Sequence, residues 1–136
     1  LTFIYPFIDN QYKNEIFKDI KSIDTDLGRV ERLIMYKLFS QTKVAFSIPI
    51  SDSSPRSVYE AIFCGAVVAI TYNSYYEILP QCMKSRIIII DFNDPEWFQD
   101  AITKADIIQK TLFIPSKEAL DLFDQKKSFK KIANLY

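Results

Sequence analysis

The sequence contains no histidine, and this absence excludes several kinds of catalytic site. Ser-His-Asp and Cys-His nucleophile systems need an imidazole base, and His-ligated metal motifs need the same side chain. Glycine is almost as scarce, since Gly28 and Gly65 are the only two. A G-x-G-x-x-G dinucleotide motif needs three glycines, and a Walker A loop needs two that are close together and followed by lysine. The sequence therefore carries neither of these nucleotide-binding motifs.

The two cysteines, Cys64 and Cys82, are too few for a four-thiolate zinc site or a disulfide scaffold. We expect both thiols to behave as unreactive small hydrophobic groups in a reducing, cytoplasmic setting. Seventeen Lys and Arg residues balance seventeen Asp and Glu residues, whereas a nucleic-acid binder would show a basic excess. No apolar run is as long as a bilayer span, and residues 1–8 lack the basic start of a signal peptide.

Strand-like and helix-like segments alternate along the chain. Four runs rich in branched and aromatic residues predict β-strands at residues 1–5, 44–50, 66–71 and 86–91, with a further short strand at 21–24. The last three of the four runs are apolar almost throughout, which is typical of parallel strands covered on both faces. Helical spacing or helix-start signals mark residues 11–19, 29–41, 55–64, 74–79, 94 to about 104, and 116 onward. The sequence therefore predicts an α/β fold with a Rossmann-like, doubly wound parallel sheet and helices on both faces.

In such a sheet, ligands bind beyond the carboxyl ends of the strands, and the loop at residues 50–56 is the most informative one. Ser54 can cap the following helix and Pro55 can take its first position, so that the N–H groups of Arg56 and Ser57 point outward. Together with the charge of Arg56, these groups predict a site for a phosphate. The alternative is an ordinary capped helix with a solvated arginine.

Glu60 is a carboxylate inside an otherwise apolar helical segment, so it needs hydrogen-bond partners if it is buried. The vicinal hydroxyls of a nucleotide ribose would supply two donors. The alternative is that Glu60 pairs with a basic side chain or contacts water on the solvent-exposed face of the helix. Asp52 lies on the preceding loop, and we expect it to reach the same rim and accept hydroxyls of an attached sugar.

The stretch SIPISDSSPRSVYEAIFCGAVVAI resembles the donor-site segment of GT-B retaining glycosyltransferases of the glycosyltransferase 4 family. That family carries an acidic residue, seven further residues, a glutamate, and then Ala-x-x-x-Gly before a buried strand. Asp52, Glu60, Ala61 and Gly65 stand in this register. The D-x-x-P-x-S-x-x-E form is similar to that of family members that build surface polysaccharides. The resemblance covers about residues 1–110.

The resemblance implies that residues 1–136 are the C-terminal, nucleotide-sugar-binding lobe of a two-lobed enzyme, truncated at its N-terminus. The whole protein would transfer a sugar from UDP or GDP to a saccharide or lipid-linked acceptor, with retention and without a metal or other cofactor. Asp52 would hold the sugar and Glu60 the ribose, as the catalytic pair. The implied donor-binding residues are Ser53, Ser54, Pro55, Arg56, Ser57, Glu60, Ser74 and Glu77. The partner lobe of the same protein would bind the acceptor.

The sequence also departs from the family's pattern. The first acidic residue is usually glutamate and is Asp52 here, and the Gly-rich turn after the next strand is replaced by residues 72–75. The strand and helix that carry the family's diphosphate-binding basic residue would precede Leu1, so we expect this chain alone to be inactive. One alternative function is a GT-B-like binding or assembly domain without activity. A nucleotide-sugar epimerase ranks lower, because such sites use groups, including histidine, that this chain lacks.

Three weaker patterns have simpler interpretations. Ser74 and Glu77 fit a capping box, although the resemblance places Glu77 near the donor. Residues 24–26 form a D-x-D triplet, which we interpret as a helix cap or a solvated turn. A basic cluster near the C-terminus predicts a solvated helix face or, alternatively, a peripheral contact with anionic lipid headgroups at the inner face of the membrane; its members are Lys126, Lys127, Lys130 and Lys131, beside Phe129 and Ile132.

Overall fold

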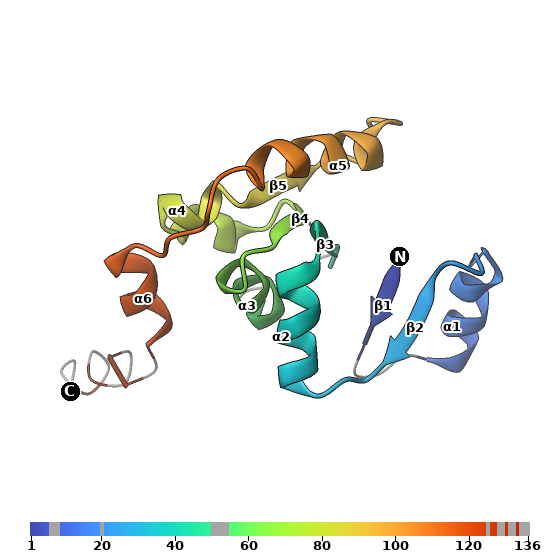
Figure 1. Ribbon diagram of the computed structural model, residues 1–136, viewed down its shortest axis with the longest axis horizontal. Coiled ribbons are helices and arrows are strands. Elements are labelled where there is room, and N and C mark those ends of the chain that lie inside the picture. The colour runs from blue at the N-terminus through green and yellow to red at the C-terminus, as the bar shows by residue number, and fades with distance from the viewer. Residues whose placement is uncertain are drawn as a thin grey trace. The chain divides into compact units, whose positions relative to one another are not determined.

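A computed structural model describes residues 1–5, 9–19, 21–49, 55–124, 126–127, 130 and 133 of the chain (Figure 1). The chain divides into two compact units, Leu1–Lys37 and Leu38–Tyr136. The division falls inside the helix α2 (Arg32–Gln41), which matches the helix predicted at residues 29–41.

The first unit pairs two short parallel strands, β1 (Thr2–Ile4) and β2 (Thr25–Gly28). Between them lie α1 (Asn10–Ile16) and the 3-10 helix η1 (Phe17–Asp19), in agreement with the helix predicted at residues 11–19. Asp9 caps α1, because its side chain accepts a hydrogen bond of 3.0 Å from the backbone N–H of Tyr12. The unit therefore has its own β-α-β order.

Two predictions for this unit are wrong. Residues 21–24 form a turn and not a strand, since the Asp24 N–H donates to the carbonyl of Lys21 at 2.9 Å. The strand follows directly at Thr25, so the D-x-D triplet neither caps a helix nor forms a solvated turn. Asp26 instead accepts hydrogen bonds from the Tyr5 hydroxyl at 2.8 Å and forms an ion pair with Lys13 at 3.0 Å. These contacts connect β1, α1 and β2, and they lower the pKa of Asp26.

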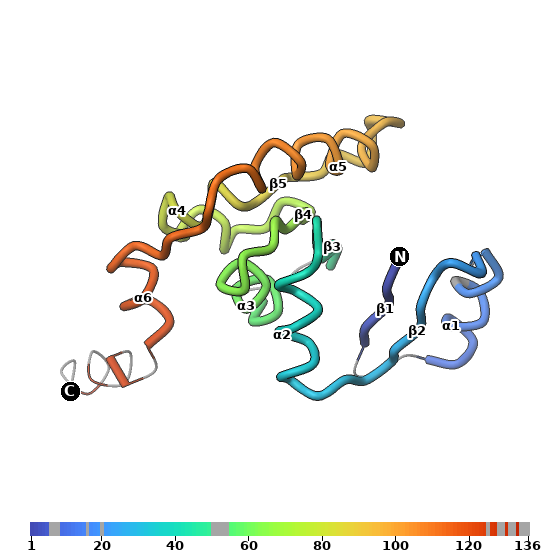
Figure 2. The backbone as a smooth tube through the Cα atoms, in the orientation of Figure 1, coloured from blue at the N-terminus to red at the C-terminus, as the bar shows by residue number. Residues whose placement is uncertain are grey.

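The second unit is built on a three-stranded parallel sheet with the order β3-β4-β5. Its strands β3 (Val44–Ser47), β4 (Val67–Thr71) and β5 (Ile87–Ile90) lie within the runs that the sequence predicted. Figure 2 shows the α-helices that alternate with these strands: α3 (Arg56–Phe63) precedes β4, α4 (Gln81–Lys84) precedes β5, and α5 (Trp97–Ile108) follows β5.

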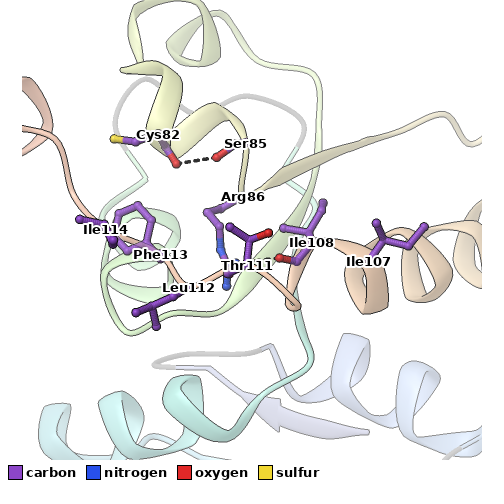
Figure 3. Close-up of a pocket in the computed structure, with 9 residues that line it drawn as sticks. All are labelled: Cys82, Ser85, Arg86, Ile107, Ile108, Thr111, Leu112, Phe113 and Ile114. Carbon is purple, nitrogen blue, oxygen red and sulfur yellow. Dashed lines mark hydrogen bonds between the residues drawn. The ribbon is translucent and has the colours of Figure 1, made fainter.

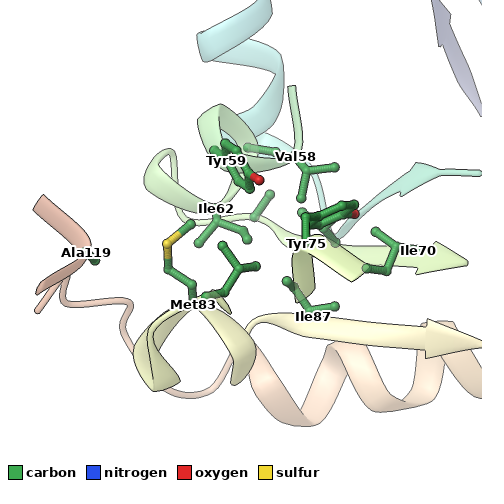
Figure 4. Close-up of a cluster of buried hydrophobic side chains, with 12 residues drawn as sticks. Val58, Tyr59, Ile62, Ile70, Tyr75, Met83, Ile87 and Ala119 are labelled. Carbon is green, nitrogen blue, oxygen red and sulfur yellow. The ribbon is translucent and has the colours of Figure 1, made fainter. Parts of the chain in front are cut away.

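Both faces of the central strand β4 are buried. Val68 and Ile70 face a cluster formed by α3, α4, the 3-10 helix η2 (Ser74–Ile78) and α6 (Lys117–Phe123). In Figure 4, Ile62 of α3 lies beside Met83 of α4 next to this face of the strand, and Tyr59 lies near Tyr75.

The alternate residues of β4, Val67 and Ala69, face the opposite helix α5. Ala101 and Ala105 let α5 approach the sheet closely, because their side chains are small and fully buried. This double coverage explains why the strand shows no alternation of apolar and polar residues. The predicted α/β fold, Rossmann-like with helices on both faces of a parallel sheet, is confirmed for this unit.

Two details of the second unit differ from the predictions. Cys82 lies in α4, a short helix that the sequence did not reveal, where its thiol donates to the Ser116 hydroxyl at 3.3 Å. The last helix begins after Ser116 as predicted, but α6 ends at Phe123; after a break at Asp124, Lys126, Lys127 and Lys130 of the basic cluster are again helical. Lys131, Phe129 and Ile132 of this cluster lie outside the described residues.

Candidate functional site

The parallel sheet brings the predicted binding loops to one edge. In the strand register, Ser47 is paired with Ile70 and Thr71 with Ile90, so the three strands end side by side. The Thr71 hydroxyl donates to the carbonyl of Pro49 at 2.9 Å and thereby connects the loops that follow β3 and β4. Among the described residues, this edge therefore collects the segments at 48–49, 72–73 and 91–96.

The helix α3 starts at Arg56, one residue later than the sequence predicted. Pro55 occupies the N-cap position and not the first helical position, because its ψ of 94° is extended. Its carbonyl accepts the first hydrogen bonds of the helix, from the N–H groups of Val58 at 3.1 Å and Tyr59 at 3.3 Å. Arg56 and Ser57 precede these donors, and both are exposed. Their N–H groups lie at the positive end of the helix dipole, where an anion is favoured.

Ser53, Ser54 and Asp52 lie outside the described residues, as does Ser51. Because Pro55 holds the N-cap position, the prediction that Ser54 caps the helix is wrong. The predicted approach of Asp52 to Glu60 stays a prediction.

Glu60 lies on the second turn of α3 and is half-buried. Helical spacing puts it on the same side as Arg56 and Cys64, because these positions are four residues apart. The residues around Glu60 in the chain are buried in the core: Val58, Tyr59, Ala61 and Ile62. The carboxylate thus belongs to the one incompletely buried stripe of the helix. Burial and, to a smaller extent, the Glu60 charge raise the pKa of the Cys64 thiol.

Gly65 ends the helix and turns the chain into β4. Its φ of +92° is a backbone conformation that L side chains rarely adopt, which explains why glycine occupies this position. The Gly65 N–H donates to the carbonyl of Ile62 at 2.9 Å, and the Ala66 N–H donates to that of Ala61 at 3.0 Å. This pattern satisfies the last carbonyls of α3 and fixes the direction in which β4 begins.

The loop after β4 contradicts the predicted capping box. The N-cap of η2 is Asn73, so Ser74 is its first helical residue and cannot act as the cap. The carboxylate of Glu77 instead accepts a hydrogen bond of 3.0 Å from the hydroxyl of Tyr72, which raises the pKa of Tyr72. Ser74 and Glu77 are both exposed on the segment that follows the carboxyl end of β4.

Comparison of the chain with protein-family models, with curated proteins and with solved structures finds no match.

The loop after β5 is held by its own acidic side chains. Asp91 accepts hydrogen bonds from the backbone N–H of Asn93 at 2.9 Å and from its side-chain amide at 2.8 Å. Asp94 accepts from the N–H of Glu96 at 2.9 Å. The helix α5 then starts at Trp97 and extends to Ile108, later at both ends than the segment predicted from Asp94 to about Lys104. These carboxylates organise the third loop at the sheet edge.

Sequence reasoning missed the structural importance of Arg86, whose side chain is only 5% exposed. Its guanidinium donates to the carbonyls of Ile108 at 3.2 Å and Thr111 at 2.8 Å, and also to the carbonyl of Gly65. Burial lowers the pKa of Arg86. The one available signal was a charged residue directly before an apolar strand, which does not show where the side chain goes.

Arg86 also lines a pocket of about 410 Å³, which lies at the amino end of β5 and thus at the opposite edge from the predicted site. Figure 3 shows the Arg86 side chain beside Thr111, with Phe113 and Ile108 on either side. The pocket wall is mainly apolar, and Arg86 already donates to three carbonyls there. We therefore assign this pocket no part in the candidate site.

Among the described residues, no three His, Cys, Asp or Glu side chains are grouped so that they could hold a metal ion. No helix in the described ranges combines the length and the apolar character that crossing a membrane requires.

Proposed function

We propose that this chain is the donor-binding lobe of a retaining GT-B glycosyltransferase. The whole enzyme would move a sugar from a nucleoside diphosphate to a saccharide or lipid-linked acceptor in glycan or polysaccharide synthesis. The observation that carries the proposal is the position of three residues at the start of α3, the helix that follows the parallel strand β3. Arg56 and Ser57 are exposed on its first turn, and the half-buried Glu60 lies one turn further along. The register of Asp52, Glu60, Ala61 and Gly65 supports it.

Each residue of this register has a distinct task in the proposal. The N–H groups of Arg56 and Ser57, with the Arg56 guanidinium, would bind the diphosphate. Glu60, one turn further along the helix, would accept hydrogen bonds from the ribose hydroxyls. Asp52 would hold the hydroxyls of the transferred sugar, with help from the backbone of residues 53–55.

The proposed chemistry is transfer by positioning and electrostatics. The bond between the anomeric carbon and the diphosphate oxygen breaks, the acceptor oxygen forms the new bond, and the acceptor proton leaves with the diphosphate. Negative charge develops on the diphosphate oxygen as its bond breaks. Donors fixed at the start of α3 stabilise this charge more strongly than that of the ground state, which lowers the barrier. The other lobe of the same protein would bring the acceptor.

The direct test is to titrate the chain with UDP, GDP and inorganic diphosphate and to follow the backbone amides by NMR. We expect shifts at Arg56, Ser57 and Glu60 with at least one nucleotide. Glu60→Gln should weaken nucleotide binding by about tenfold, because a charged acceptor for two hydroxyls is lost. It should leave the binding of inorganic diphosphate unchanged, whereas Arg56→Gln should weaken both. Glu118→Gln, at an exposed position on α6, serves as a matched control for the change of charge.

A second candidate function is a GT-B-like binding or assembly domain without activity. The turn at residues 72–75 favours it, because the family has a Gly-rich turn there for close approach of the backbone to the donor. Among the described residues only Gly28 and Gly65 have a positive φ, so this turn adopts ordinary backbone conformations. The proposal requires a dissociation constant no weaker than about millimolar. If the chain is folded and its amides do not shift at about millimolar nucleotide, this second function is favoured.

A further inference from the structure

The outer edge of β5 lacks the usual features that prevent strands from pairing between molecules. β5 is the last strand in the order β3-β4-β5, and it consists of four isoleucines with neither a charge nor a proline. It pairs with β4 residue for residue from Ile87 to Ile90. Natural sheet edges are commonly protected by lysine, proline or a bulge, and none of these interrupts β5.

The hydrogen bonds between β4 and β5 show which backbone groups of β5 point away from the sheet. The Val68 N–H donates to the carbonyl of Arg86 at 2.9 Å, so Arg86 faces β4. Successive residues of a strand alternate in direction, and Ile88 therefore also faces β4. The N–H and C=O groups of Ile87 and Ile89 point away from β4.

An apolar groove of about 310 Å³ lies along this edge. Its wall consists of Ile87, Ile88, Ile89, Lys104, Ile107 and Ile108. Two of the isoleucines in this wall are substantially exposed, since Ile89 is 41% and Ile107 62% accessible. The groove thus offers apolar surface from β5 and α5 beside two outward-facing backbone positions.

The charges at the two ends of β5 favour a second copy of the chain in the antiparallel direction. Thr111 binds Arg86, so the adjacent Lys110 lies at the amino end of β5. Asp91 and Asp94 follow its carboxyl end. An antiparallel copy would place Lys110 of each chain near the acidic end of the other, whereas a parallel copy would place like charges together.

We propose that two copies of this chain associate through their β5 edges and form one continuous six-stranded sheet. A twofold axis passes next to Ile88, so that Ile87 of each copy exchanges backbone hydrogen bonds with Ile89 of the other. The axis is perpendicular to the sheet, and both α5 helices therefore lie on the same face, with their Ile107 side chains over the new seam. The candidate sugar site plays no part in this association, so either proposal can fail without the other.

The association is tested by sedimentation of the full 136-residue chain over protein concentrations from about 10 µM to about 1 mM, the range of weak dimers. We expect a reversible monomer–dimer equilibrium. Ile89→Lys should raise the dimer dissociation constant by at least about tenfold, because an ammonium group must then enter the apolar seam. Leu120→Lys, at a comparably exposed apolar position on α6, should leave the constant unchanged.

Amide hydrogen exchange supplies a second measurement that needs no variant. The N–H groups of Ile87 and Ile89 should become more protected as the protein concentration rises, while those of Ile88 and Ile90 should already be protected in the monomer. A chain that stays monomeric at all concentrations overturns the proposal. The edge of β5 would then be expected to pair with an extended segment of another protein. A dimer that Ile89→Lys does not weaken, or whose Ile87 and Ile89 exchange is independent of concentration, also overturns it.

Discussion

The guanidinium of Arg86 donates a hydrogen bond of 2.8 Å to the carbonyl of Thr111, which is 25 positions away in the sequence. The same side chain binds the carbonyls of Gly65 and Ile108. One buried cation therefore joins the turn before β4, the end of α5 and the segment that leads to α6. The carbonyls at the end of a helix carry partial negative charge, which offsets part of the cost of burying the cation.

Arg86→Met should lower the free energy of unfolding by about 3 kcal/mol, because a charged donor to three carbonyls is lost and the carbonyls stay buried. Chemical denaturation followed by circular dichroism measures the change. The matched control is Arg56→Met, at an exposed position, where the expected change is within about 0.5 kcal/mol. Equal effects of the two substitutions would contradict the structural role of Arg86.

Gly65→Ala should cost about 1–2 kcal/mol of stability through backbone strain. A Cβ atom at this position would meet no other atom within 4 Å, so the cost comes from the φ of +92° and not from a clash. Gly65→Asn should cost less, since asparagine tolerates positive φ better than alanine. If thermal denaturation shows alanine and asparagine to be equivalent to glycine, the turn must have a different conformation.

The Cys64 thiol should react slowly with a disulfide reagent near pH 8, because burial and the charge of Glu60 raise its pKa and suppress the thiolate. Glu60→Gln removes the smaller of the two causes, and we therefore expect a faster reaction. Measuring Cys64 in a Cys82→Ser background isolates the thiol of interest. An unchanged rate in the Glu60 variant would mean that the carboxylate does not lie close to Cys64.

Asp121 should have a carboxyl pKa of about 2, below its ordinary value of 3.8, because it binds Lys127 and, at 2.9 Å, Lys117. A depressed pKa in the folded state stabilises that state above the unfolded pKa, and this contribution disappears as the pH falls through about 2. Carboxyl ¹³C shifts between pH 5 and pH 1.5 measure the titration. In Lys127→Gln the midpoint should move toward the ordinary value, whereas Lys104→Gln should leave it unchanged.

The sequence predicted the parts of this structure that rest on local pattern. β4 was predictable because a run of consecutive apolar residues has few other uses in a small domain. β2 was not, since Thr25, Asp26 and Leu27 are all exposed and show no apolar signal. The helix α4 spans four residues and is too short for helical periodicity to appear.

The candidate site was predictable to a similar degree. The stripe that contains Arg56 and Glu60 follows from helical spacing, and the edge on which α3 begins follows from the parallel sheet. The exact first residue of the helix did not follow, because the sequence is compatible with Pro55 at either the N-cap position or the first helical position. The partners of Arg86 and of Glu77 also could not be predicted, since they depend on which segments the fold brings together and not on any local pattern.

The double burial of β4 has a consequence for how the second unit melts. Val68 and Ile70 belong to one hydrophobic cluster, and Val67 and Ala69 belong to the other. Both clusters need the same ordered strand, so a loss of packing on one face of β4 also destabilises the packing on the other face. The two layers should therefore be lost in a single cooperative transition, and a calorimetric scan of this unit should show one peak.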